Sequence, residues 1–453
     1  MPVKVVAVLL AGLLAGGVSQ AQDRALASAP ATPGEVVVSE IRSRTLSVRE
    51  CLDIARSGSP LLDSLEAERL LAEGARQEVS AATRPQIDTA GSYRHWDRQR
   101  VGMLGIAPTE RQFYDCDLSE LRVTLRQLLW DGDQARKRRQ AAGLQVKSKE
   151  ALVTRTREEI GAEVLAQALG VFTAEALLKA AGKTLDDIRA TLEKMQAMEA
   201  VGRVPHVDVL RIQTRVQEVL EMQEGYRQAR ATILARLSTI LGRSETIDEL
   251  TNAGLPELRQ ELASDVERLV LKALEQRTDL AAMRLAIRGA NRQEQAQRRG
   301  NQPQVFLNTT VNRYGDQSGW GREIGFIGAE FQWVLEDGGR NRGKATQAIS
   351  QRQAALARLR QAELKAAEQV RVAFVNLHSM RVRLERNQAN LVMAEEAFRI
   401  EQVKYEQGKG TINDVLDAEA AMFQAEAQVI RSRNESLAAQ IALDLAMEQK
   451  TVD

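Results

Sequence analysis

The strongest constraint on the fold is a tandem repeat in which a predicted strand leads into a long helix. Leu129-Trp130-Asp131-Gly132 recurs 206 positions later as Leu335-Glu336-Asp337-Gly338. The same offset carries Gly202 onto Gly408, with no gap between these landmarks. Two copies with the same order of elements predict an assembly closed by symmetry rather than one globular core.

Between these landmarks, apolar residues recur every seven positions. Five heptads of this pattern predict long helices packed side by side as in a coiled coil. The heptad positions are Val164, Val171, Leu178, Leu185 and Leu192 in the first copy, and Val370, Leu377, Leu384, Leu391 and Phe398 in the second.

Each copy is predicted to contain a shorter helical segment, two strands and a long helical hairpin. A glycine-containing loop around 102–108 separates the first two strands, and a small connecting structure fills 242–262. The predicted elements of the first copy are helices 46–57 and 61–83, strands 86–97 and 118–128, and helices 134–201 and 206–241. Those of the second are a helix from 264, strands 304–313 and 324–335, a long helix after Gly339 ending near 407, and a helix 412–447.

The N-terminus has the pattern of a secretory signal peptide. Lys4 precedes an apolar run from Val5 to Val18, and the small residues of Ser19-Gln20-Ala21 fit cleavage after Ala21. The alternative, a membrane anchor, requires a longer apolar run. Residues 22–45 are rich in Ala, Pro and Ser and read as a poorly ordered lead-in.

Segment 118–128 alternates between apolar and polar residues, as a strand with one apolar face does. Strands of about 10–12 residues with alternating faces are suited to an outer-membrane barrel. Four strands cannot close a barrel around a pore, so several chains must contribute. The alternative, a soluble coiled coil with two β-hairpins, leaves strand edges unpaired. Leu121, Val123 and Leu125 face one way, and Glu120, Arg122, Thr124 and Arg126 the other.

Three features of the sequence belong together: the two Asp-Gly joints, the pairs Pro85-Gln86 and Pro303-Gln304 that enter strands, and the second turn. That turn reads Tyr405-Glu406-Gln407-Gly408-Lys409-Gly410-Thr411-Ile412-Asn413-Asp414-Val415-Leu416-Asp417-Ala418. In these features the chain resembles the TolC family of outer-membrane efflux and secretion proteins, from about Leu46 to Met447.

The resemblance implies an α+β membrane protein that assembles as a homotrimer. Four strands per chain would form a 12-stranded β-barrel in outer-membrane lipid, continued by a long periplasmic α-helical coiled-coil barrel built from two internal structural repeats. Such a protein is a passive exit duct of a tripartite efflux pump or type I secretion system. It docks a periplasmic adaptor (membrane fusion protein) coupled to an inner-membrane pump.

The expected organisation has five parts. A signal peptide occupies 1–21, followed by a lead-in and equatorial helix at 22–60. The first repeat spans 61–241, an equatorial connector spans 242–263, and the second repeat spans 264–453.

Four residues are candidates for a periplasmic gate. Asp414 and Asp417 share a helix face, and Asp417 has no Lys or Arg three or four positions away. In the family's matching motif, aspartates here ring the narrow end of the tunnel. For Asp414 a helix-capping role with Thr411 is the alternative. Tyr405 continues the heptad and is expected in the core, while the resemblance implies a hydroxyl link to Asp208 that holds the coil shut.

The resemblance also implies that Val201, Gly202, Gly408 and Thr411 meet the adaptor at the periplasmic tips. The alternative for the glycines is a purely conformational role in the turns. One departure concerns the gate, because similar proteins carry a basic residue where this chain has Gly410. Either Arg203 or Lys409 takes over the role of that basic residue, or the gate is held closed less tightly.

Composition excludes several other functions. Lys and Arg number 62 against 61 Asp and Glu, so no nucleic-acid partner is expected. Three scattered histidines and unclustered methionines predict no metal or cofactor site, and no catalytic constellation is visible. Cys51 and Cys116 are expected to be free thiols, far apart. The alternatives to an exit duct are a free-standing diffusion porin and a structural coiled-coil surface protein.

Overall fold

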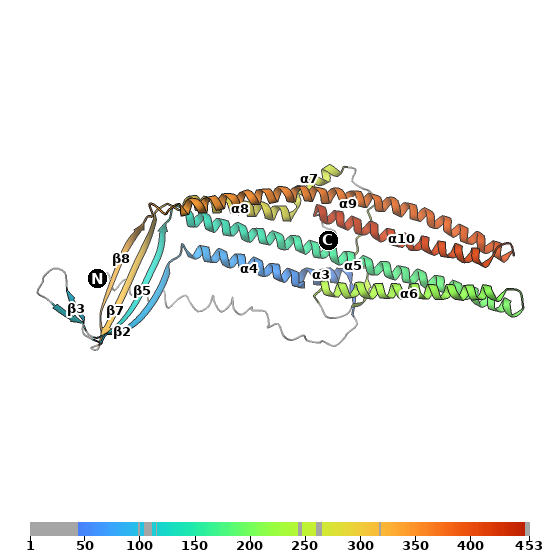
Figure 1. Cartoon of the computed structure of the whole chain (residues 1–453), viewed down its shortest axis with the longest axis horizontal. Helices are drawn as coiled ribbons and strands as arrows, with labels where there is room; N and C mark the ends of the chain where they lie inside the picture. Colours follow the sequence, from blue (N-terminus) through green and yellow to red (C-terminus); the bar gives the residue numbers. More distant parts are fainter. Residues whose placement is uncertain are drawn as a thin grey trace. The chain divides into compact units, whose positions relative to one another are not determined.

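The computed structural model describes residues 44–97, 100–103, 111–114, 116–242, 247–259, 265–316 and 319–448. The predicted signal peptide, most of the lead-in and the centre of the loop after residue 103 lie outside these residues. The described chain divides into two units (Figure 1). Residues 74–142 and 291–349 form a unit that contains the main sheet, and residues 44–73, 143–290 and 350–448 form a helical unit.

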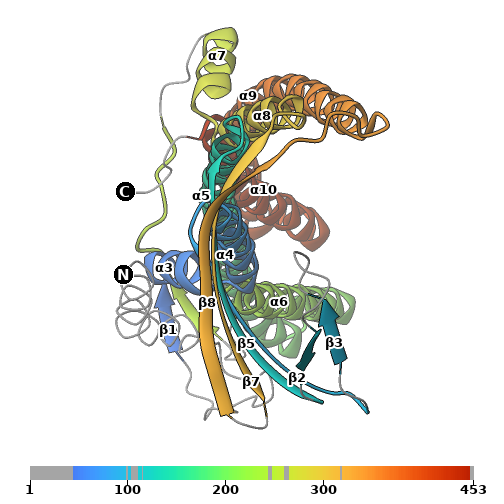
Figure 2. The same ribbon diagram turned by 90° about the vertical axis from the view of Figure 1, so that its left-hand side faces the viewer.

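The main sheet contains four strands in the order β2-β5-β7-β8, each antiparallel to its neighbour. Figure 2 shows these strands side by side as long, curved ribbons. Within the described residues, β2 and β8 are its two edges. The strands span Gln86–His95 (β2), Asp117–Trp130 (β5), Gln304–Asp316 (β7) and Gly319–Gln332 (β8).

The sheet has two chemically different faces, as the alternation in segment 118–128 predicts. On one face Val123 lies opposite Val311, and Leu125 lies between Ile87 and Thr309. On the other face Glu120 pairs with Arg94 at 3.3 Å and with Arg122 at 2.5 Å. Arg122 donates to Asn312 at 3.2 Å on the neighbouring strand. Because side chains alternate along a strand, this register separates an apolar face from a charged, hydrogen-bonded one.

The repeated Asp-Gly joints start the long helices in the same way. Asp131 Oδ2 accepts from the backbone N–H of Ala135 at 2.6 Å, and Asp337 Oδ2 accepts from that of Asn341 at 2.8 Å. Gly132 has φ +68°. The carboxylates thus satisfy N–H groups that the first helical turn leaves free, which explains why the motif recurs.

The helical unit is built on two long hairpins. Helices α5 (Gln134–Ala200) and α9 (Arg340–Glu406) each have 67 residues, equivalent to about 100 Å at about 1.5 Å per residue. Helix α6 (His206–Ile240) follows α5, and α10 (Ile412–Met447) follows α9. The structure thus confirms the predicted long helices.

The heptad pattern marks much of the buried surface of these helices. Val164, Val171 and Leu185 are buried in α5, while Val370 and Leu377 are buried in α9. The first set packs with residues of α6 in two apolar clusters, and the second packs with α10 and α7 (Val266–Gln276). Apolar burial along these stripes stabilises the hairpins.

Short elements surround the middle of the helical unit and differ in part from the prediction. β1 (Arg44–Ser47) pairs in parallel with β6 (Ile247–Thr251), a ladder that the sequence did not indicate. Helix α3 (Val48–Gly58) starts at a capping box between Ser47 and Glu50, and α4 (Pro60–Ala81) follows.

Three predicted elements need correction. The helix expected from residue 264 is two helices, α7 and α8 (Thr278–Arg298), because the backbone at Arg277 turns to an extended conformation with ψ 123°. The predicted strand 324–335 begins earlier, at Gly319, and ends at Gln332. The predicted loop around 102–108 begins and ends in short paired strands, β3 (Arg100–Met103) and β4 (Arg111–Tyr114).

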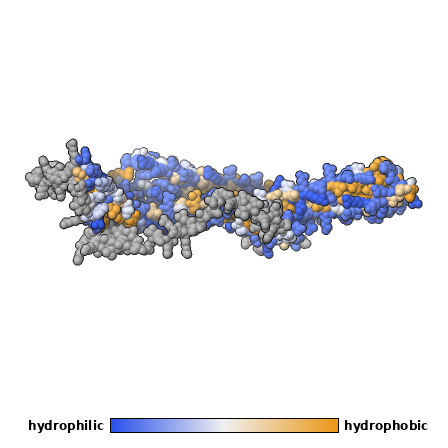
Figure 3. Space-filling view, turned by 90° about the horizontal axis from the view of Figure 1, so that it is seen from below, coloured by the Kyte–Doolittle hydropathy of each residue, from blue (hydrophilic) through white to orange (hydrophobic). Residues whose placement is uncertain are grey.

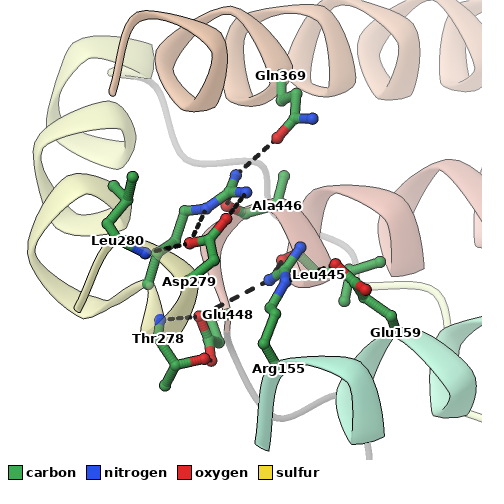
Figure 4. Close-up of polar contacts among 10 residues, drawn as sticks. Arg155, Glu159, Thr278, Asp279, Leu280, Gln369, Leu445, Ala446 and Glu448 are labelled. Atoms are coloured by element: carbon green, nitrogen blue, oxygen red, sulfur yellow. Dashed lines mark hydrogen bonds and ion pairs between the residues drawn. The ribbon is translucent and has the colours of Figure 1, made fainter. Parts of the chain in front are cut away.

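Two buried arginines hold the C-terminal end of α10 (Figure 4). Arg155 of α5 donates to the Leu445 carbonyl at 3.0 Å and lies 3.7 Å from the Glu448 carboxylate. Arg277 donates to the Ala446 carbonyl at 3.3 Å and to Asp279 at 2.7 Å. These charged donors thus bind carbonyl groups of the last helical turn, where a positive charge is favourable.

A third arginine, Arg259, joins the connector to α10. Arg259 donates to both carboxylate oxygens of Asp444, at 2.8 and 3.0 Å. Burial raises the pKa of Asp444, and the hydrogen bond from Arg259 opposes that rise. Cys51 is buried in the helical unit and Cys116 is half-buried beside β5. Neither forms a disulfide among the described residues, as expected.

Candidate functional site at the helical tips

The two long hairpins end in turns with the same backbone geometry. After α5, the N–H of Gly202 donates to the Glu199 carbonyl and the N–H of Arg203 to the Met198 carbonyl, at 2.8 and 2.9 Å. After α9, Gly408 donates to Tyr405 and Lys409 to Lys404 at 2.9 and 2.8 Å. This pair of hydrogen bonds defines a Schellman motif, in which the glycine adopts the left-handed backbone conformation.

Both tip glycines adopt that left-handed conformation, with φ +73° at Gly202 and +71° at Gly408. No atom lies within 4 Å of the position that a Cβ would take at either glycine. The backbone angle therefore explains these glycines, while the open space around them leaves room for a partner. Val201, next to the first glycine, is 70% exposed.

The second tip carries a complete capping box, which confirms the capping interpretation of Thr411 and Asp414. The Thr411 hydroxyl accepts from the Asp414 N–H at 3.3 Å, and Asp414 Oδ2 accepts from the Thr411 N–H at 3.0 Å. The hydrogen bonds from Thr411 lower the pKa of Asp414. Its carboxylate is therefore ionised and already engaged in fixing the start of α10.

Asp417 lies three residues further along α10 and differs from Asp414 in its surroundings. Its side chain is exposed. Among the contacts of the described residues, Asp417 has no hydrogen bond or ion pair, whereas Asp208 on α6 lies 3.5 Å from Arg211. Of the three aspartates, Asp417 thus carries the negative charge that is least compensated.

Tyr405 packs in the core as expected, but its hydroxyl does not form the expected link to Asp208. It packs against the apolar cluster of α5, α6 and α10, as the heptad predicts. Its hydroxyl donates to Met195 Sδ at 3.3 Å rather than to a carboxylate. Burial, and after it the charge of Asp208, raises the pKa of Tyr405. The structure therefore brings Asp208 within electrostatic range of Tyr405 without a hydrogen bond between them.

Gly410, where the resemblance implies a basic residue, is closely packed. A Cβ at this position would lie 3.3 Å from Lys404 Cβ and 3.3 Å from the Tyr405 nitrogen. A larger residue here would therefore require the end of α9 to shift by a few tenths of an ångström.

Sequence reasoning missed Glu419, which is 5% exposed on α10. It lies on the same helix face as the buried residues Ile412 and Phe423. Burial raises the pKa of its carboxyl to about 7, with Arg215 lowering it and Asp187 raising it. A carboxylate at an otherwise apolar heptad position was the signal that could have revealed it.

The chain matches the family model described as "Outer membrane efflux protein" over residues 51–243 and 269–448. The comparison with curated protein sequences found no match. The fold is similar to a membrane protein from Pseudomonas aeruginosa, at 19% identity and a TM-score of 0.75, covering 88% of this chain and 93% of that one.

Two further solved structures share the fold. The outer membrane protein VceC from Vibrio cholerae is 18% identical with a TM-score of 0.72, covering 89% of this chain and 96% of its own. The open state of the MtrE outer membrane channel from Neisseria gonorrhoeae is 18% identical with a TM-score of 0.72, covering 93% and 95%.

The chain belongs to the outer membrane efflux protein family, because the family model matches well over half of its length. Membership gives it an outer-membrane location with a periplasmic helical extension, and a transport rather than a catalytic function. Among the described helices, only α5 contains a window long and apolar enough to cross a membrane, and half of that window is buried within the chain.

Proposed function

We propose that three copies of this chain form a passive exit duct across the outer membrane. The observation that carries the proposal is the four-stranded sheet with an apolar face, a polar face and two open edges. Pairing β8 of one copy with β2 of the next removes every open edge when three copies close a ring of twelve strands. The apolar face would then meet lipid and the polar face the lumen.

In this proposal the helices continue the duct into the periplasm, and the chain is built from two structural repeats. The equal lengths of α5 and α9 and the identical turns at Gly202 and Gly408 support an arrangement in which both hairpins serve as equivalent walls. The duct is coupled to an inner-membrane pump or type I secretion system through a periplasmic adaptor.

The tips supply the proposed docking and gating residues. Val201, Gly202, Gly408 and Thr411 are exposed and lie at the two turns, where an adaptor can approach the backbone closely. Asp417 is the main gate residue, because three copies around an axis would concentrate negative charge there. Asp414, Asp208 and Tyr405 support this gate by fixing the start of α10 and the packing of the turns.

The test combines conductance with export. Purified protein in planar bilayers should conduct ions, and cells should require both the chain and the adaptor to export cargo. The variant Gly408→Val should abolish adaptor-dependent export while leaving trimers intact, with Gly343→Ala, inside α9, as the control that retains export. Conductance together with normal export by Gly408→Val would favour a free-standing porin over an adaptor-coupled duct.

A further inference from the structure

A cavity of about 550 Å³ lies between the two hairpins near their turns, within the helical unit. Its walls come from α5, the turn after it, the C-terminal end of α9 and the start of α10. Figure 3 shows apolar residues gathered toward the end of the unit that carries these turns. A cavity of this size lies within the range of about 300–1,000 Å³ that small-molecule sites occupy.

Most of the cavity wall is apolar and adaptable. Met195 and Met198 contribute polarisable thioethers from α5, and Phe398 and Tyr405 contribute aromatic rings from α9. Met195 is 3% exposed and Met198 is 43% exposed, so the methionines line the cavity from its floor to its rim. Aromatic faces attract organic cations, and thioethers make favourable contacts with flat aromatic groups.

One buried carboxylate interrupts this apolar wall. Glu419 lines the cavity and is 95% buried, and no hydrogen bond or ion pair of the described residues involves it. A buried carboxylate without a partner is unfavourable in its charged form, and a ligand that supplies a cation would remove that cost.

The other charged groups around Glu419 do not neutralise it by contact. Arg215 of α6 donates at 3.0 Å to Glu218 instead. Asp187, Lys194 and Arg203 line the cavity but are exposed at its rim, where water screens them. Glu406 at the end of α9 is also exposed and adds a further negative charge.

We propose that this cavity binds a monovalent organic cation with an apolar body, its charge facing Glu419 and its body against the methionines and aromatic rings. The volume suits a small molecule, and the lone buried carboxylate selects a positive charge over a neutral or anionic group. Because the walls come from both hairpins, the ligand stabilises their present arrangement at the tips. This site shares Gly408 with the proposed adaptor-docking residues and Tyr405 with the proposed gate, but binding to it does not depend on export.

The test measures binding of tetraphenylphosphonium to the detergent-purified full chain. This probe is permanently charged, so any pH dependence of its binding reports the protein. Glu419→Gln should weaken binding at pH 8 by about tenfold or more. The matched control is Glu426→Gln, because Glu426 lies two turns further along α10 and does not line the cavity. The neutral triphenylphosphine oxide should bind equally to all three proteins.

The pH profile adds an independent measurement. Because Glu419 titrates near neutrality, wild-type affinity for the phosphonium should fall about tenfold from pH 8 to pH 6, and Glu419→Gln should lose this dependence. If Glu419→Gln fails to assemble, Met198→Trp decides, because the larger side chain fills the cavity and should abolish binding while keeping the carboxylate. Equal phosphonium binding by wild type and either assembled variant would overturn the proposal.

Discussion

The two hairpin tips share one turn but begin their return helices differently. Gly202 and Gly408 end α5 and α9 in the same Schellman motif. Helix α6 starts at Pro205 without a side-chain cap, whereas α10 starts at the Thr411–Asp414 capping box. The same turn therefore forms with and without a side-chain cap on the return helix.

The hairpins also differ about two helical turns beyond the cap. Glu419 on α10 is buried against α5 and α6, while Gln213, which lies 206 positions earlier on α6, is exposed. At these two equivalent positions, a buried carboxyl group with a raised pKa is thus present only in the second hairpin.

The largest expected effect concerns Glu419. An acid whose folded pKa is raised from 4.5 to about 7 stabilises the fold fully below pH 4.5 and loses that contribution as pH rises through 7. Glu419→Gln should therefore raise stability at pH 8, by about 3 kcal/mol at most, and much less at pH 5. Thermal unfolding at both pH values measures this. Gln213→Glu, at the exposed equivalent position, should change stability little. Equal changes in stability from both substitutions would contradict the difference proposed between the two hairpins.

The next effect concerns the turn that the tips share. Gly202→Val and Gly408→Val should each lower stability by about 1–2 kcal/mol, because a β-branched residue is strained at positive φ. Gly343→Ala, in the helical interior of α9, should instead raise stability by about 0.5–1 kcal/mol. Denaturant titration measures all three. If Gly202→Val left stability unchanged while Gly408→Val lowered it, the two turns would not be equivalent.

A smaller effect separates the two helix starts. Thr411→Ala removes the cap and should cost about 1 kcal/mol, whereas Pro205→Ala removes no cap bond and should cost less. Because the pKa of Asp414 is lowered, its contribution is present above pH 3.8 and is lost as pH falls through its folded pKa. In Thr411→Ala, stability should therefore depend less on pH in the acid range. Thr411→Ser keeps the hydroxyl and should retain the pH dependence of the wild type.

The smallest expected effect compares the exposed Asp417 with the half-buried Asp208. Asp417→Ala should raise, several-fold, the concentration of a trivalent cation that half-blocks conductance in planar bilayers. Asp208→Ala should raise it less, because Arg211 already compensates Asp208. Unchanged blockade by Asp417→Ala would remove this residue from the proposed gate.

The sequence predicted the long elements because their signals are local. Gly202 and Gly408 marked the ends of α5 and α9, and Pro85 and Pro303 preceded β2 and β7. The break between α3 and α4 falls at Gly58-Ser59-Pro60 and was predictable. The equivalent break at Arg277 contains no glycine or proline. Contacts with distant residues such as Ala446 hold it instead, and the local sequence therefore did not reveal it.

The candidate site was predictable to a similar extent. The motif around Thr411 and Asp414 specifies a cap within four residues, and the structure contains it. The β1–β6 ladder and the burial of Glu419 depend on which distant segments meet, and the sequence pattern carries no such information. The placement of Asp208 relative to Tyr405 likewise depends on how two hairpins pack.

The mass of the detergent-extracted mature protein tests the central proposal most directly, by light scattering with the detergent contribution subtracted. Closure of the open β2 and β8 edges by neighbouring copies predicts a particle of three chains with both helical and strand signals in circular dichroism. A stable single chain, or one that stays dissolved without detergent, would contradict it.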